Sequence, residues 1–217
     1  MTDDPARSRA RQSLESAAAQ AASAVTRFVN EGAGPVTGAA AYAEDRLSKF
    51  DGDAERAIRR IVNETTTATG ATGFTTGVGG FVTLPAAIVA NLAGSMLLNA
   101  RMVGAIADLR GWSLEDETAQ TAILLLAAGG SLNESLTAAG VKVGGHATMK
   151  LIETIPIEVI RSINKKAGFM LIAKYGTKRS VVTLAKVVPV VGGVVSGGVD
   201  VGFTRVVARA AKRAFPG

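Results

Sequence analysis

Apolar residues recur at three- and four-residue intervals along several stretches of the chain, and this period predicts amphipathic helices. The first stretch covers residues 14–29, and its helix is expected to end at Gly32 or Gly34. A shorter helix is expected over residues 36–50. The next one begins at Asp53, whose side chain can cap the first backbone N–H groups. The start of the chain is therefore predicted to be helical.

The pattern changes between Glu64 and Arg101, where the chain contains no charged residue. The first part of this segment is rich in Thr and Gly, and a helix is predicted from Pro85 to Leu109. Residues 77–98 are long enough to span a bilayer, but Pro, Asn, Gly and Thr lower their hydrophobicity. A buried core helix is therefore favoured. The alternatives are reversible insertion or a lipid-facing hairpin, and a true membrane span.

Helical patterns continue in the second half of the chain. Ser113 is predicted to cap a helix whose first turn is acidic and which ends at Gly129. The Val-rich run at residues 187–195 has strand propensity, but its glycines recur every fourth residue, which favours a helix from Pro189 on. Further helices are expected over residues 146–153, 156–166 and 168–175.

These elements predict an all-α fold, a compact multi-helix bundle with Gly-rich apolar central helices and an N-terminal helical arm. The arm is assigned to residues 1–50 and the helical domain to residues 51–217. Of the chain, 47% is hydrophobic but only 5% aromatic, and 25 residues are Gly, a composition that suits closely packed helices. The glycines expected to permit close helix packing are Gly70, Gly73, Gly77, Gly193 and Gly197.

Charge is distributed unevenly. Residues 150–217 hold 12 Lys and Arg against three Asp and Glu, a net charge of +9 within the total of +6, which leaves −3 for residues 1–149. The predicted contacts to an anionic surface are Arg205, Arg209, Lys212 and Arg213, which recur on one side of a helix while Phe203, Val206, Val207 and Ala210 face inward. Anionic membrane lipid is favoured over nucleic acid, because the chain has no recognition motif and few aromatic residues for stacking. An ordinary solvated helix face is the alternative.

The sequence offers little catalytic chemistry. Cysteine is absent and His146 is the only histidine, so we expect no metal site and no cofactor. The glycines near residue 80 lack the Lys of a phosphate-binding loop, and there is no Gly-x-Ser-x-Gly nucleophile motif, so no catalytic residue is assigned. For Arg101 and Asp108 the favoured explanation is partly buried charges that each pair with a charge on another helix, and a polar site in the apolar core formed by Arg101, Asp108 and His146 is the alternative.

Several motifs then occur in a characteristic order: Gly70-Ala71-Thr72-Gly73-Phe74, Gly80-Phe81, Leu84-Pro85, Asn99 to Ala107, Leu114-Glu115-Asp116 and Val188 to Gly198. In this order, over Asp53 to Phe215, the chain resembles the EcsC family of bacterial proteins. The resemblance implies a helix-rich bacterial protein, and the family is named after a gene that lies beside those of an ABC transporter. The family pattern tends to have Asn near Asp200, so any role of that position is not carried over.

Together these features predict a non-enzymatic accessory protein that associates with membrane or lipid. No apolar run follows the basic residues 7–11, so we expect no export and a cytoplasmic protein, peripheral on the inner face of the plasma membrane. Its partner would be anionic lipid or an apolar ligand. The alternatives are an enzyme that acts on a lipid or apolar substrate, and a soluble adaptor for a membrane transport complex or secretion system.

Overall fold

The computed structural model describes residues 5–72, 94–129, 132–138, 141–142, 144–145, 148–175 and 192–217. Apart from one hairpin, whose two strands have two residues each, every regular element in this part of the chain is helical. This confirms the predicted all-α bundle. Expectations for Gly73, Gly77, Pro85, His146 and the run at 187–191 lie outside the described residues.

In chain order the elements are α1 (Pro5–Glu31), β1 (Gly32–Ala33), β2 (Val36–Thr37), α2 (Ala39–Ser48), α3 (Ala54–Thr72), α5 (Gly94–Leu109), α6 (Glu117–Ala127), α7 (Leu132–Ala138), α8 (Met149–Ile152), α9 (Ile157–Tyr175) and α11 (Gly192–Ala214). The two strands pair antiparallel, with Gly32 opposite Thr37 and Ala33 opposite Val36. This hairpin turns the chain from α1 into α2.

Local side chains set several helix ends. The Asp53 side chain accepts a hydrogen bond from the Arg56 backbone N–H at 2.9 Å, as the N-cap prediction requires. The prediction that Ser113 caps α6 is wrong. Asp116 is the N-cap, and its carboxylate accepts from the backbone N–H groups of Thr118 and Ala119, whereas Ser113 begins the preceding turn. Gly111 follows α5 with a φ of +79°, a conformation that glycine adopts without a steric cost.

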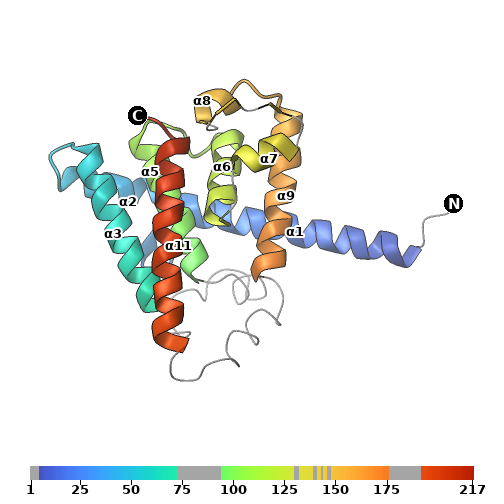
Figure 1. The fold of residues 1–217 in the computed structure, drawn as a ribbon, viewed down its shortest axis with the longest axis horizontal. Coiled ribbons are helices and arrows are strands. Elements are labelled where there is room, and N and C mark those ends of the chain that lie inside the picture. Colours follow the sequence, from blue (N-terminus) through green and yellow to red (C-terminus); the bar gives the residue numbers. More distant parts are fainter. Residues whose placement is uncertain are drawn as a thin grey trace.

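The central helix of the bundle is α5, which packs against α1, α2, α3, α6 and α11 (Figure 1). Its buried side chains include Met96, Met102 and Ile106, each with no exposed surface. The helices α3 and α11 lie side by side on one flank of α5, and α6 and α9 lie on the other. The apolar character of α5 therefore follows from its position, since five neighbouring helices cover most of its surface.

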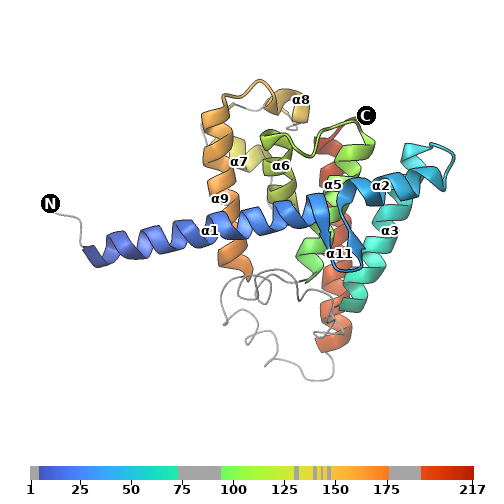
Figure 2. The same ribbon diagram turned by 180° about the vertical axis from the view of Figure 1, so that it is seen from behind.

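Helix α1 crosses the bundle and contacts α9, α5, α6 and α2 (Figure 2). Its N-terminal turns extend past α9 and away from the other helices. Its C-terminal half is part of the core, because Val25 and Phe28 are in the same apolar cluster as Tyr42, Ile58 and Ile106. Core packing therefore continues across the predicted boundary at residue 50.

Glycines permit close helix contacts at several crossings. A Cβ at Gly168 would lie 2.7 Å from the Ala18 carbonyl oxygen, so α9 and α1 touch through their backbones there. This contact explains why the separate helices expected at 156–166 and 168–175 form the single helix α9, with its glycine inside. A Cβ at Gly70 would lie 3.1 Å from Val201 Cγ2, between α3 and α11. Gly193 and Gly197 both lie within α11.

The uncharged segment is described at its two ends only. Residues 65–72 continue α3, and residues 94–100 begin α5, where Met96, Leu97 and Ala100 are buried in the core. Among the helices described, none combines the length and the hydrophobicity needed to cross a bilayer.

Candidate functional site

A cleft of about 380 Å³ opens between α2, α3 and α5. These helices lie at the end of the bundle away from the N-terminus (Figure 2). Polar and apolar side chains line the cleft together: Thr37, Ala41, Tyr42, Asp45, Arg46, Glu64, Thr65, Ala68, Leu98 and Arg101. Its volume is in the range of small-molecule sites in proteins.

One wall of the cleft is a hydrogen-bonded cluster around Glu64. The Tyr42 hydroxyl and the Arg46 Nε–H both donate to Glu64 Oε2 at 2.8 Å, and the Arg60 Nε–H donates to Glu64 Oε1 at 2.6 Å. Burial favours a higher pKa for the Glu64 carboxyl, but the hydrogen bonds from Tyr42, Arg46 and Arg60 outweigh it, and the pKa is lowered. Glu64 is thus a carboxylate with three donors already bound.

Tyr42 connects this cluster to the core. Its side chain comes from α2, is 7% exposed and belongs to the main apolar cluster. Burial raises the pKa of its phenol to about 12, and the hydrogen bond to Glu64 and the charge of Glu64 act in the same direction. Tyr42 is therefore a neutral hydrogen-bond donor across the physiological pH range.

Arg101 of α5 stacks on the ring of Tyr42. Its guanidinium carbon lies 3.8 Å from the ring centroid, and its Nη2 donates to Thr37 Oγ1 at 2.9 Å. The Nε–H is buried and has no hydrogen-bond partner, and no carboxylate in the described part of the chain lies within ion-pair distance of the guanidinium. Burial lowers the pKa of this half-buried side chain. Arg101 is thus a cation held by a tyrosine face and one hydroxyl.

A second hollow of about 270 Å³ adjoins the cleft and is lined by Arg46, Lys49, Phe50, Arg60 and Glu64. Asp45, which lines the cleft, forms ion pairs with Lys49, at 2.9 Å, and with Arg46. Around the two hollows together there are four cations, Arg46, Lys49, Arg60 and Arg101, and two carboxylates, Asp45 and Glu64. The surplus of positive charge favours anions over cations here.

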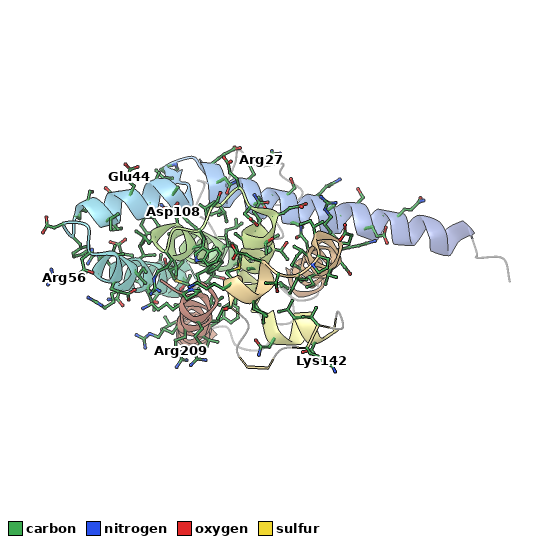
Figure 3. The ribbon with its side chains drawn as sticks, turned by 90° about the horizontal axis from the view of Figure 1, so that it is seen from above. Arg27, Glu44, Arg56, Asp108, Lys142 and Arg209 are labelled. Atoms are coloured by element: carbon green, nitrogen blue, oxygen red, sulfur yellow. The ribbon has the colours of Figure 1, made fainter. Side chains whose placement is uncertain are left out.

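The structure places the other predicted polar residues elsewhere. Asp108 lies two turns beyond Arg101 on α5, does not line the cleft and forms no ion pair with Arg101. Burial raises the pKa of its carboxyl, and the negative charge of Glu44 on α2 adds to the effect. Figure 3 shows the two acids from above. His146 is outside the described residues, so Arg101 alone of the three is in the cleft. Within the described ranges, no three Asp, Glu or His side chains are grouped closely enough to hold a metal ion.

The four cations predicted to contact an anionic surface lie on α11, and we call them the basic face: Arg205, Arg209, Lys212 and Arg213. The three arginines are exposed and Lys212 is half-buried, and none of the four has an ion-pair partner among the described residues. The prediction that Val206 faces inward is wrong. Val206 is 53% exposed, because α11 packs on α3 and α5 through Thr204, Val207, Ala208 and Ala211.

Sequence reasoning did not identify Tyr42, Arg46 and Glu64. One signal was available, since Glu64 and Arg101 are the two charged residues that bound the uncharged segment, and charges beside apolar sequence tend to be partnered. Another was the spacing of Tyr42 and Arg46, which are four apart and therefore on one face of a helix. These side chains come together in one cleft only because α2, α3 and α5 pack against one another.

Comparison with protein-family models, with curated proteins and with solved structures finds no match for this chain. Evidence for the function of this protein therefore comes from the geometry of the described residues and from the sequence motifs.

Proposed function

We propose that the protein is a non-enzymatic accessory protein that associates with an anionic membrane surface through the basic face of α11. The observation that carries this proposal is that Arg205, Arg209 and Arg213 are exposed and form no ion pair with any described residue, with the exposed Val206 among them. Exposed arginines usually find acidic neighbours or remain hydrated. Here an apolar side chain accompanies them, as on surface helices that lie on lipid.

The energetics of such an association are favourable. Each Lys or Arg held near an anionic bilayer contributes about 1 kcal/mol, and the attraction decays within a Debye length. Helix α11 carries four cations and one acid, Asp200, so its net charge is +3. Val206 adds apolar contact with the acyl boundary. Several weak attractions of this kind give reversible binding rather than permanent insertion.

A flat membrane must contact several cations at once. In Figure 3, Arg209 and Lys142 project from the same edge of the molecule, whereas Arg27 and Glu44 lie at the opposite edge. Lys142 is exposed and has no ion-pair partner in the described part of the chain. The edge that carries α11 therefore supports simultaneous contacts from two separate parts of the fold.

The cellular setting of the proposal rests on the sequence alone. The resemblance to the EcsC family suggests a bacterial cell, and the inner face of its plasma membrane is where a protein encoded beside an ABC transporter would act. We propose this location together with the membrane contact.

The test is flotation of the purified protein with phosphatidylcholine vesicles that do or do not contain phosphatidylglycerol. We expect binding to the anionic vesicles that weakens as salt is added. The variant Arg205→Glu/Arg209→Glu should bind about 30-fold more weakly or worse, because two attractions of about 1 kcal/mol each are lost and repulsion replaces them.

The matched control is Arg27→Glu/Lys150→Glu, which makes the same change in net charge at exposed, unpaired positions outside α11. It should retain most of the binding. Equal loss in both variants would show that only net charge matters and would contradict a specific basic face. Binding to native membrane vesicles alone, abolished when those vesicles are treated with protease, would instead favour the adaptor alternative.

A further inference from the structure

We propose that the cleft between α2, α3 and α5 is a binding site for an oxyanion, a phosphate group carried by a small molecule or by a lipid headgroup, with Arg101 as its principal ligand. This site is independent of the basic face of α11, because the two share no residue.

The first argument is the uncompensated charge of Arg101. Removing a guanidinium from water is costly unless a counter-charge or hydrogen bonds replace the lost hydration. Arg101 is half-buried, and its contacts are the Tyr42 ring and the Thr37 hydroxyl. Both contacts are weaker than an ion pair with a carboxylate or phosphate. Glu64 attracts the guanidinium only from beyond ion-pair distance, so a bound oxyanion would supply the direct counter-charge that the described part of the protein does not.

The second argument is donor capacity. The Arg101 Nε–H is buried and has no acceptor, which is rare for a charged donor. The Thr65 side chain also lines the cleft, and its hydroxyl has no hydrogen-bond partner among the described residues. A guanidinium presents its N–H groups in a planar fork that matches two oxygens of a phosphate or carboxylate. The Nε–H is too buried to reach a ligand directly, so the Nη groups of Arg101 and the Thr65 hydroxyl are the donors that this side of the cleft offers to a bound oxyanion.

The carboxylates of the cleft do not compete for Arg101. Glu64 already accepts from Tyr42, Arg46 and Arg60, and Asp45 is paired with Arg46 and Lys49. The pairing of these two acids leaves the surplus charge of the cluster on the Arg101 side. A cationic ligand would have to break existing ion pairs, whereas an anion needs to break none.

The size and the apolar part of the cleft limit the ligand further. A volume of about 380 Å³ exceeds what a phosphate group alone requires. Ala41, Ala68 and Leu98 provide an apolar portion beside Arg101. The arrangement fits a phosphate attached to a small organic body better than a bare ion.

The experiment follows thermal unfolding of the wild-type protein by circular dichroism in phosphate and in chloride of equal ionic strength, with inorganic phosphate and glycerol phosphate as probes. Binding to the folded state should raise Tm in proportion to the logarithm of the probe concentration once the probe exceeds its Kd, by about 3–6 °C at ten times the Kd. High phosphate raises the Tm of any protein by exclusion from its surface, so the deciding quantity is the difference between variants.

Arg101→Gln should abolish this logarithmic shift, and Arg101→Lys, which keeps the charge but loses the planar fork, should weaken it. If Arg101→Gln does not fold, the lysine variant decides the question. The control Arg59→Gln removes an exposed arginine of α3 that lines neither hollow, and it should retain the full shift. Equal shifts in wild type and Arg101→Gln would overturn the proposal.

A second experiment identifies the source of the phosphate. In the Arg205→Glu/Arg209→Glu background, vesicles containing phosphatidic acid should bind in an Arg101-dependent manner if the ligand is a headgroup. Soluble phosphates acting alone would identify a free metabolite. If neither experiment shows an effect that depends on Arg101, the oxyanion site is refuted, and the proposed role of α11 is unaffected.

Discussion

Glu64 and Arg101 both contact Tyr42, the first by accepting its hydroxyl hydrogen bond at 2.8 Å and the second by stacking on its ring at 3.8 Å. Glu64 comes from α3 and Arg101 from α5, so one tyrosine of α2 connects all three helices. The two charges also bound the uncharged segment, and their shared contact holds its two ends near each other. The polar cluster and the core are therefore expected to be coupled in stability.

Replacing Tyr42 by Phe tests this coupling. The variant loses a hydrogen bond to a carboxylate, and its free energy of unfolding at neutral pH should fall by about 1–2 kcal/mol. Denaturation by urea measures the change. A loss as small as that of an exposed substitution would show that the hydroxyl does not hold α2 against α3.

The same tyrosine predicts a dependence on alkaline pH. In the unfolded chain a tyrosine releases its proton near pH 10, whereas burial raises the pKa of Tyr42 to about 12. Between these values the unfolded state binds fewer protons, so stability should fall by roughly 2–3 kcal/mol as pH rises from 10 to 12. Tyr42→Phe should lack this part of the decline, and absorbance of tyrosinate should show a late-titrating tyrosine in the wild type that is missing from the variant.

Asp108→Asn should stabilise the protein at neutral pH. Burial and the nearby Glu44 raise the pKa of Asp108, so ionisation is less favourable in the folded state than in the unfolded state. The stability associated with the protonated form is present below about pH 3.8 and is lost as pH rises through the folded pKa. The Tm of the variant should exceed that of the wild type at pH 7 and approach it in acid. Glu115→Gln, the same neutralisation at an exposed site, should change Tm little.

Gly168→Ala and Gly202→Ala make the same substitution in two helices with opposite expected effects. A Cβ at Gly168 meets the backbone of Ala18 at 2.7 Å, and rotation of a side chain cannot relieve that contact, so about 1–3 kcal/mol of stability should be lost. A Cβ at Gly202 meets nothing within 4 Å, and alanine should stabilise α11 by up to about 1 kcal/mol. Urea denaturation compares the two, and faster proteolysis of α1 should accompany the first. Equal effects would argue against the α1–α9 contact.

Phe215→Ala should be among the most destabilising single substitutions. Phe215 has no exposed surface and packs edge-on against Trp112, with 6.2 Å between ring centroids. Removal of a buried phenyl group costs about 3–5 kcal/mol. Trp112 is the only tryptophan, so its fluorescence reports the change directly during unfolding. Val206→Ala, an exposed apolar truncation on α11, should stay within about 0.5 kcal/mol of the wild type.

The helical elements could be predicted well where the apolar periodicity agrees with the residues that cap or end a helix. The ends of α1 near Gly32 and of α5 near Gly111 follow from glycine, and the Asp53 cap follows from a side chain that accepts from its own helix. Predictions were wrong where a neighbouring helix decides the outcome. The glycine at 168 indicates a break in an isolated helix, but against Ala18 it permits a crossing.

For the candidate site, the sequence indicated Arg101 as a charge in apolar surroundings and the basic character of α11. It did not indicate that Tyr42 contacts both Arg101 and Glu64, because contacts between residues from separate helices leave no periodic trace in the chain. Likewise, the inward or outward position of Val206 depends on where α3 and α5 contact α11.

The amino-acid sequence by itself determined the helical class, the basic character of α11 and the absence of cysteine chemistry, since these depend on local periodicity and composition. Tertiary structure alone decided that α5 is central, that Arg101 stacks on Tyr42, and that the arginines of α11 form no ion pairs in the described part of the fold. The physical reason is that burial and ion pairing depend on distances between segments remote in sequence, which only packing of the whole chain establishes.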